Sequence, residues 1–208
     1  INVGLVGSEM CIRDSIVGGS KVSTKLNVIK NLISNSSKVL VGGGIANTFL
    51  KAAGHEVGIS LVEDEMIDIS RKLLDTNKII LPKNVYVANS TQANSAELVP
   101  VQDVNKNKMI LDIELSEEVR SISNHKYIIW NGPLGIFEIE QFSNGTKQLI
   151  NFLENSSSNV IAGGGETIYA ISKFSDIKKF NYVSTAGGAF LEYLSGYRLP
   201  SIEALRLK

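Results

Sequence analysis

Two lysines follow a pair of glycines near the start of the chain, in the run Gly18-Gly19-Ser20-Lys21-Val22-Ser23-Thr24-Lys25. Because Lys21 and Lys25 are four residues apart, they share one face if the segment is helical. Two ammonium groups beside a helix N-terminus repel each other unless an anion lies between them, and a polyphosphate meets that need. The alternative is a pair of solvated surface lysines, but the preceding glycines favour an anion site.

Three other apolar runs end in a glycine cluster and continue into a helix-like pattern, at Gly42-Gly43-Gly44, Gly163-Gly164-Gly165 and Gly187-Gly188. A strand–glycine–helix turn leaves backbone N–H groups unpaired at the helix start, and these groups attract anions together with the helix dipole. Glycine also allows a ligand to approach the backbone closely. The alternative for Gly42–Gly44 is tight packing of strand against helix without a ligand.

Two carboxylates stand close to such turns. Glu166 follows Gly163-Gly164-Gly165 and precedes Thr167, so it could hold a magnesium ion on phosphate oxygens, or simply cap the helix with Thr167. Glu138 follows the rigid segment Trp130-Asn131-Gly132-Pro133 and could accept hydrogen bonds from two ribose hydroxyls; the alternative is a solvated side chain.

Apolar periodicity predicts strands that alternate with helices, which indicates a parallel sheet built from βαβ units. The expected strands are 38–41, 79–81, 85–88, 109–113, 127–130, 160–162 and 182–184, and the expected helices are 23–33, 46–53, 63–74, 116–122, 145–153, 167–174 and 189–194. We expect a doubly wound, Rossmann-like α/β fold with helices on both faces of the sheet, forming a single domain. Ligands of such sheets bind outside the carboxyl ends of the strands, where all the glycine clusters fall.

Composition narrows the function classes. Lys+Arg and Asp+Glu are both 21 of 208 residues, and this balance argues against a nucleic-acid or anionic-membrane surface. There is no run of about 18 apolar residues that would span a bilayer. The single cysteine, Cys11, favours a reducing cytoplasm. The Walker A and G-x-G-x-x-G patterns are both missing, and the second omission disfavours a dehydrogenase.

Taken together and in this order, the glycine, tryptophan and lysine motifs resemble the C-terminal, nucleotide-binding domain of phosphoglycerate kinase, in its bacterial form. The similar blocks are ValGlyGlySerLysValSerThrLys, ValGlyGlyGlyIleAlaAsnThrPheLeu, TrpAsnGlyProLeuGlyIlePheGlu, AlaGlyGlyGlyGluThr and SerThrAlaGlyGlyAlaPheLeuGlu. The resemblance implies a phosphotransferase with a carboxyl group as acceptor, which transfers phosphate between 1,3-bisphosphoglycerate and ADP to give 3-phosphoglycerate and ATP in glycolysis. It also implies Mg²⁺ as cofactor, a monomer, and glycerate binding by an N-terminal domain that this chain lacks.

The resemblance implies a role for each motif residue. Lys21, Gly187 and Gly188 would face the reacting phosphoryl group, and Glu166 would hold the metal. The nucleotide-binding set would be Lys25 for phosphate, Gly42, Gly43, Gly44 and Leu134 beside the adenine, Glu138 on the ribose, and Gly164, Gly165, Glu166 and Thr167 in the phosphate loop.

Four features depart from the family pattern. Without its N-terminal domain the chain should not turn over alone. Glu166 stands where the family usually has Asp, and Ala186 replaces the first of three glycines, which is unfavourable if that position needs a positive φ. Residues 1–15 do not match and suggest a foreign start, so we expect the domain to cover 16–208 and its first strand to be frayed.

Two other functions stay open. One is a different nucleotide-dependent transferase that uses a similar sheet with another first domain. The other is a non-catalytic nucleotide-binding module, in which Glu166 and Ala186 would mark lost chemistry.

Overall fold

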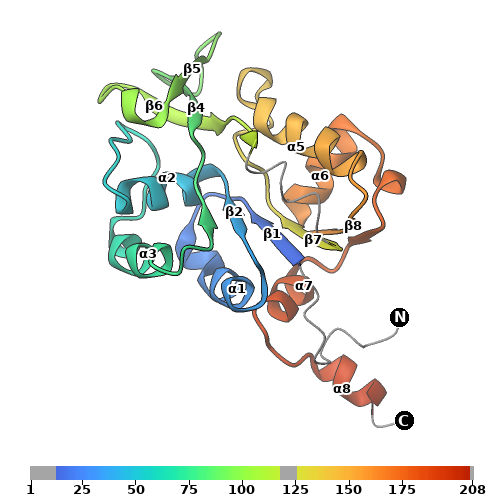
Figure 1. The fold of residues 1–208 in the computed structure, drawn as a ribbon. Coiled ribbons are helices and arrows are strands. Elements are labelled where there is room, and N and C mark those ends of the chain that lie inside the picture. Colours follow the sequence, from blue (N-terminus) through green and yellow to red (C-terminus); the bar gives the residue numbers. More distant parts are fainter. Residues whose placement is uncertain (1–12, 118–125, 207–208) are drawn as a thin grey trace.

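A computed structural model describes residues 13–117 and 126–206 (Figure 1). These residues contain a six-stranded sheet in the order β3-β2-β1-β7-β8-β9, in which every pair of neighbours is parallel. Its strands are β1 (Arg13–Val17), β2 (Val39–Val41), β3 (Ile79–Ile80), β7 (Tyr127–Asn131), β8 (Asn159–Gly163) and β9 (Tyr182–Ser184). The doubly wound α/β fold is thereby confirmed.

The strand order reverses at β1. Strands β2 and β3 extend the sheet to one side of β1, whereas β7, β8 and β9 extend it to the other. The loops that leave β1 and β7 therefore diverge from neighbouring strand ends, and this is the point at which open α/β sheets form their ligand crevice.

Helices cover both faces of the sheet because alternate strand residues point to opposite sides. On one face, Ile16 and Ile128 pack with residues of α5 (Asn144–Glu154) and α6 (Gly165–Phe174). On the other face, Val17 and Ile129 pack with α1 (Val22–Asn35), α2 (Gly43–Ala52) and α7 (Gly187–Leu194). The remaining helices are α3 (Ile67–Leu74), which contacts α2, and α8 (Pro200–Arg206), which extends away from the body in Figure 1.

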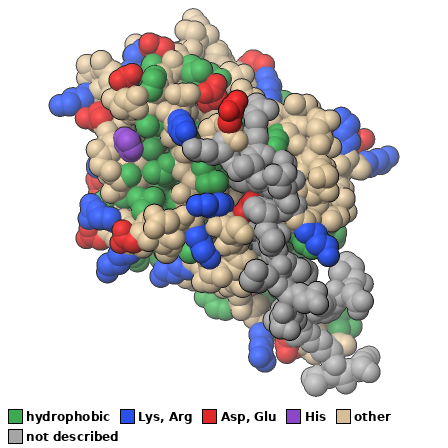
Figure 2. Space-filling view, viewed as in Figure 1, with side chains coloured by type: hydrophobic (Ala, Val, Ile, Leu, Met, Phe, Trp, Pro, Cys, Tyr) green, Lys and Arg blue, Asp and Glu red, His purple; other side chains and the backbone are tan. Residues whose placement is uncertain are grey.

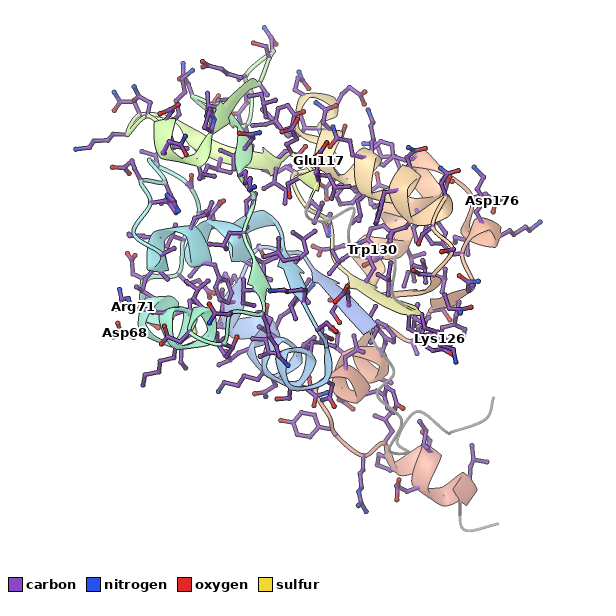
Figure 3. The ribbon with its side chains drawn as sticks, in the orientation of Figure 1. Asp68, Arg71, Glu117, Lys126, Trp130 and Asp176 are labelled. Carbon is purple, nitrogen blue, oxygen red and sulfur yellow. The ribbon has the colours of Figure 1, made fainter. Side chains whose placement is uncertain are left out.

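Trp130 lies in the interior (Figure 3). Its side chain has no exposed surface, packs against Phe180 at 6.1 Å between ring centroids, and donates from Nε1 to the Gly132 oxygen at 2.8 Å. The indole therefore fixes both the core and the first residue of the loop after β7.

The prediction of a frayed first strand is wrong. Strand β1 is paired on both sides, with Ser15 opposite Val39 in β2 and Ile129 in β7. Asp14 and Ser15 are buried but have partners: Ser15 Oγ lies 2.8 Å from Ser36 Oγ, and the Lys38 N–H donates to Asp14 Oδ1 at 2.8 Å. Residues 1–12, the rest of the segment expected not to match, lie outside the described residues.

A second sheet departs from the expectation of one parallel sheet. Strands β4 (Asn84–Ala88), β5 (Glu97–Pro100) and β6 (Met109–Ile113) pair antiparallel in the order β5-β4-β6, at the top of Figure 1. The sequence predicted β4 and β6 but missed β5, and it could not tell which sheet they join because strand direction leaves no local pattern. The expected helix at 116–122 falls largely outside the described residues.

Short helical turns complete the chain at η2 (Asp64–Met66), η3 (Val101–Asp103), η5 (Glu140–Phe142) and η6 (Ile177–Lys179). Among the described helices, none combines the length and the apolar character needed to cross a bilayer. Acidic and basic side chains are interspersed over the face drawn in Figure 2, in keeping with the balanced composition.

The N-terminus of α1 is capped by a residue distant in sequence. Glu63 accepts from the Ser23 N–H at 2.9 Å and from the Ser23 hydroxyl at 2.5 Å. Partial burial acts to raise the pKa of Glu63, but hydrogen bonds from Ser23 and the Val22 N–H and the charge of Lys21 hold it below its ordinary value. Glu63 therefore already supplies an anion at this helix start.

Replacing this cap should destabilise the fold. Because the pKa of Glu63 is lowered in the folded state, its contribution is present above the ordinary pKa of 4.5 and is lost as the pH falls below it. We expect Glu63→Gln to lower the free energy of unfolding by about 1 kcal/mol at neutral pH and by much less at about pH 3. Urea denaturation measures both values, with the exposed Glu65→Gln as control; equal effects of the two substitutions would contradict the capping role.

Candidate functional site

Five loops meet at the carboxyl edge of the large sheet, and every residue that the sequence assigned to a site lies on or just after them. The β1 loop carries Lys21 and leads to Lys25, the β2 loop carries Gly42–Gly44, and the β7 loop carries Leu134 and Glu138; Gly164–Thr167 follow β8 and Gly187-Gly188 follow β9. Parallel strands explain this convergence, because their carboxyl ends share one edge.

Lys25 lies where the β1 and β7 loops meet. Its Nζ donates to the Gly18 oxygen at 2.6 Å, and a Cβ added to Gly132 would lie only 2.7 Å from the same Nζ. Burial lowers the pKa of Lys25 to about 8, while the nearby charge of Glu166 raises it. The ammonium group of Lys25 from α1 and the carboxylate of Glu166 from α6 therefore interact across the switch point, which is the place between β1 and β7 where the strand order reverses.

The two lysines do not form the pair that their spacing predicted. Lys21 precedes the first residue of α1 with extended backbone angles, φ −134° and ψ 129°, so the helical face that carries Lys25 does not include it. Lys21 is exposed, and its charge acts on Glu63, whereas the charge that acts on Lys25 is that of Glu166.

The turn Gly42–Gly44 is closed by backbone contacts. The N–H groups of Gly42 and Gly43 donate to the Val17 and Leu134 oxygens at 3.0 and 2.7 Å, and a Cβ on Gly44 would lie 2.3 Å from the Ser20 oxygen. This turn thus shows the tight packing that was the alternative to a ligand site, and the N–H groups of Gly42 and Gly43 already have acceptors within the fold.

The side chain of Leu134 is buried behind the β2 turn. It has no exposed surface, and a Cβ on Gly42 would lie 2.5 Å from its Cδ2. Its side chain fills the core behind the β2 turn, and its place beside a base stays a prediction. What it contributes to this edge is the main-chain bond that it accepts from Gly43.

The starts of α6 and α7 are open. A Cβ added to Gly165, Gly187 or Gly188 would meet nothing within 4 Å. These glycines form the first turns of their helices, where N–H groups have no intrahelical acceptor. Ala186 precedes α7 with φ −85°, so this position does not need glycine for its backbone conformation. A ligand can therefore approach this edge of the sheet most easily at the ends of β8 and β9.

Two buried polar side chains join the β7 and β8 loops. Thr167 Oγ1 accepts from the Gly132 N–H at 2.7 Å, so Thr167 positions the loops from within the core. Asn131, which sequence reasoning did not assign, donates from Nδ2 to the Gly163 oxygen at 2.7 Å, while its buried Oδ1 has no partner among the described residues. A polar residue at the end of an apolar strand was the available signal.

Glu138 is exposed at the end of the β7 loop. Lys173 holds this end of the loop from α6, because its Nζ donates to the Phe137 and Glu138 oxygens at 3.1 and 2.8 Å. The Phe137 ring packs edge-on against Tyr169 at 5.3 Å between centroids. The carboxylate is thereby free to meet a ligand while its backbone is fixed.

A divalent cation would depend on few protein ligands. The described residues contain no cluster of three or more His, Cys, Asp and Glu side chains. Glu166 is exposed at the first turn of α6 beside open space, which fits a magnesium ion held by one carboxylate and by oxygens of a phosphate ligand.

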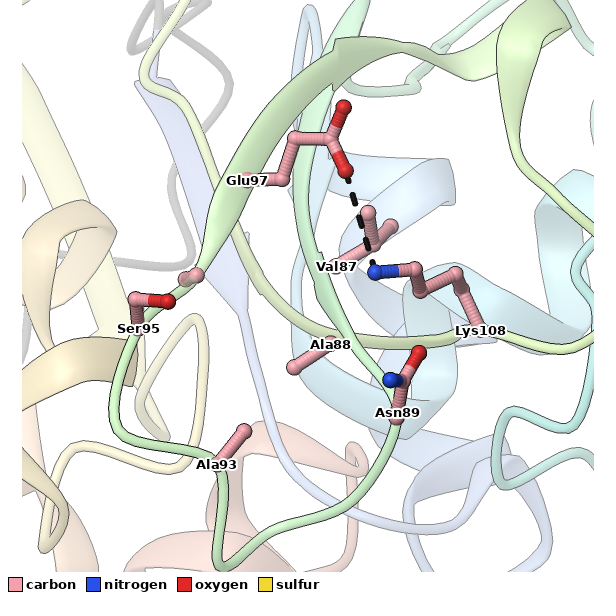
Figure 4. Close-up of a pocket in the computed structure, with 8 residues that line it drawn as sticks. Val87, Ala88, Asn89, Ala93, Ser95, Glu97 and Lys108 are labelled. Carbon is pink, nitrogen blue, oxygen red and sulfur yellow. Dashed lines mark ion pairs between the residues drawn. The ribbon is translucent and has the colours of Figure 1, made fainter.

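Two cavities lie away from this edge. One, of about 210 Å³, is in the antiparallel sheet, where Lys108 and Glu97 approach at 3.8 Å (Figure 4). The other, of about 370 Å³, lies between α1 and the residues that follow α7. Neither contains a residue that the sequence assigned to the site.

Two glycine substitutions should distinguish a glycine that is packed against backbone from one that faces open space. A Cβ on Gly18 would lie 1.8 Å from the Pro133 oxygen, so we expect Gly18→Ala to lower the free energy of unfolding by about 3 kcal/mol. Gly165→Ala meets open space and should leave it unchanged or raise it by up to about 1 kcal/mol. Urea denaturation measures both; a stable Gly18→Ala variant would show that the β1 and β7 backbones are not in contact.

The chain is similar to known proteins over nearly all of its length. The family described as phosphoglycerate kinase matches residues 13–197, so the match begins at β1 and not at residue 16. The phosphoglycerate kinase of Psychrobacter sp. (strain PRwf-1) is 45% identical over 205 residues, which cover 92% of this chain and 51% of that protein. That of Psychrobacter cryohalolentis is 43% identical and is covered to 52%.

Solved structures agree. The phosphoglycerate kinase of Coxiella burnetii superposes with a TM-score of 0.87 at 39% identity, covering 94% of this chain and 52% of that one. The enzyme of Pyrococcus horikoshii gives a TM-score of 0.81 at 27% identity, with 97% and 53% covered. The chain spans about half the length of the relatives that it matches. It belongs to the phosphoglycerate kinase family.

Proposed function

We propose that this chain is the nucleotide-binding half of a phosphoglycerate kinase and binds MgADP or MgATP at the carboxyl edge of its sheet. The observation that carries the proposal is the opposition of Lys25 and the open start of α6 across the switch point. An ammonium group on one side and unpaired N–H groups on the other suit the oxygens of a diphosphate.

Each side of the site has a different task. Lys25, on the side of α1, would neutralise the charge of a phosphate. A bound anion would in turn raise the lowered pKa of Lys25 and so keep its ammonium group charged. The N–H groups of Gly165, Glu166 and Thr167 would donate hydrogen bonds to other phosphate oxygens. Gly164, at φ +100°, allows the turn that directs these groups. Asn131 Oδ1 is a further polar atom at this edge that is left to a ligand or water.

Glu166 would hold magnesium together with phosphate oxygens, and the ion would supply neutralising charge on the diphosphate. Its extra methylene relative to Asp is compatible with this task, because Glu166 is exposed and faces open space. Glu138 would accept hydrogen bonds from the ribose hydroxyls. The β2 turn, with Gly42–Gly44 packed on Leu134, would support the base through its backbone.

In the reaction, an oxygen of the ADP β-phosphate attacks the phosphorus of the acyl phosphate. The bond from that phosphorus to the acyl oxygen breaks, which leaves the carboxylate of 3-phosphoglycerate and forms ATP. Lys21 and the N–H groups of Gly187 and Gly188 would face the transferring group, and their work is positioning and charge neutralisation. No covalent enzyme intermediate is needed.

The acyl phosphate would bind to another part of the whole protein. We propose that an N-terminal domain supplies that site in a monomeric, cytoplasmic enzyme, and that these residues alone do not turn over. A non-catalytic nucleotide-binding module is the rival, but one of its two arguments is weakened because Ala186 has an ordinary φ of −85°.

A thermal melt tests the proposed site directly. MgADP at about 100 times its dissociation constant should stabilise the folded chain by about 2.7 kcal/mol, which is a shift of roughly 5 to 10 °C. Lys25→Ala should reduce this shift, whereas Lys30→Ala, an exposed lysine of the same helix, should not. A cooperative melt with no shift, or equal shifts in both variants, would contradict the assignment. Fusing a matching N-terminal domain then separates the rivals, since turnover supports the kinase and binding without turnover supports the module.

A further inference from the structure

A buried carboxylate lies behind the β7 loop and has no part in the site described above. Asp112 belongs to β6, in the antiparallel sheet, and its side chain has 1% of its surface exposed. Its two oxygens accept from different backbone groups: Oδ1 from the Ile113 N–H at 2.9 Å, and Oδ2 from the Gly145 N–H at 2.8 Å. It thereby connects the second sheet to the start of α5.

Asp112 replaces a local cap on that helix. Ser143 precedes α5 but makes no capping bond with its side chain, and the first turn of α5 contains no acidic residue. The N–H groups of Gly145 and Asn144 bond to Asp112 instead. A carboxylate at a helix N-terminus also interacts favourably with the helix dipole.

The same carboxylate is in close contact with the β7 loop. A Cβ added to Gly135 would lie 2.2 Å from Asp112 Oδ1, so this residue passes directly over the side chain. The neighbours of Gly135 are tied to the elements that Asp112 joins: the Leu134 N–H donates to Thr146 Oγ1 at 3.1 Å, and the Ile136 N–H donates to the Leu111 oxygen at 2.9 Å.

We infer that Asp112 is a positioning residue, which holds the loop of residues 133–138 on α5 and β6 in the shape that presents Glu138 to a ligand. The ligand part of this inference rests on the proposed function. The loop part stands on the contacts of Asp112 alone. A change at Asp112 should therefore act on both the loop and nucleotide affinity, without any contact to the nucleotide.

The charge state of Asp112 makes the inference testable. Burial raises the pKa of Asp112 to about 7, although N–H groups of Gly145, Ile113 and Asn144 and the charge of Lys147 lower it. Asp112 in turn acts on Tyr86 of β4: burial raises the pKa of Tyr86, and the charges of Glu114 and Asp112 raise it further. Below about pH 7 one oxygen becomes a donor and can no longer serve a backbone N–H group well; above it, both oxygens accept.

Retaining this carboxylate has a cost. Because its pKa is raised, the folded state holds the proton of Asp112 more tightly than the unfolded state does, and the free energy of unfolding falls as the pH rises from the ordinary pKa of 3.8 towards 7. A buried group that lowers the free energy of unfolding at neutral pH and yet holds a loop in place is typical of a residue that positions a functional site and does not stabilise the fold.

The test compares Asp112→Asn with Asp103→Asn, which removes an exposed carboxylate from the same region of the fold. At about pH 8 we expect Asp112→Asn to weaken MgADP binding about fivefold, and at about pH 6, where wild type is protonated, to weaken it much less. Asp103→Asn should match wild type at both values. No deficit at about pH 8, or an equal deficit in Asp103→Asn, would overturn the positioning role.

Hydrogen exchange without nucleotide separates this inference from the proposed function. The Gly145 and Ile136 amides should exchange faster in Asp112→Asn than in wild type at about pH 8, after correction for intrinsic rates, and equally fast at about pH 6. In wild type alone, protection of these amides should change with a midpoint near pH 7, which covers the case of a variant that does not fold. If wild type does not bind MgADP, the proposed function fails while exchange still decides on Asp112; a protection level independent of pH would overturn it.

Discussion

The β1 and β7 loops touch through their backbones, and the candidate site depends on this contact. Gly18 passes so close to Pro133 that any side chain would occupy the space of its carbonyl group, and Gly132 is equally close to Gly18. The β2 turn then packs on both loops through Gly43. Lys25 reaches the switch point only because these glycines leave room for its stem and its ammonium group.

The same constraint divides the glycines into two kinds. Several glycines of the β1, β2 and β7 loops, Gly18 and Gly132 among them, lie against neighbouring backbone, and the N–H groups of these two donate within the fold. Gly165, Gly187 and Gly188, at the starts of α6 and α7, face open space, although the Gly187 N–H donates to the Thr185 oxygen at 3.1 Å. Glu63 already occupies the start of α1, so that helix contributes the side chain of Lys25 rather than its own N-terminus. The anion site is therefore asymmetric.

Much of the fold could be predicted from the sequence, because apolar runs bounded by glycines mark buried parallel strands and the helices that follow them. Family resemblance added the order of the motifs. What could not be predicted depends on tertiary contacts. The polar strand β1 is ordered because Ser36 and the Lys38 backbone meet its side chains, and neither partner is evident from residues 13–17. The separate β5-β4-β6 sheet left no local signal.

The site shows the same limit. Spacing predicted a shared face for Lys21 and Lys25, but the helix begins one residue too late for Lys21 to join it. Leu134 was expected beside the adenine and its side chain is buried, while Asn131 and Asp112, both buried polar residues on strands, were not assigned. Hydrophobic periodicity predicts that a position is buried. It does not predict which polar group of a distant segment will hydrogen-bond to a carboxylate or amide buried there.

A crystal structure of this chain with MgADP tests the central claim most directly. We predict diphosphate oxygens within hydrogen-bonding distance of Lys25 Nζ and of the N–H groups of Gly165 and Glu166, with the metal on Glu166. A diphosphate bound at the start of α1 in place of Glu63, or in the cavity between α1 and the residues after α7, would contradict it.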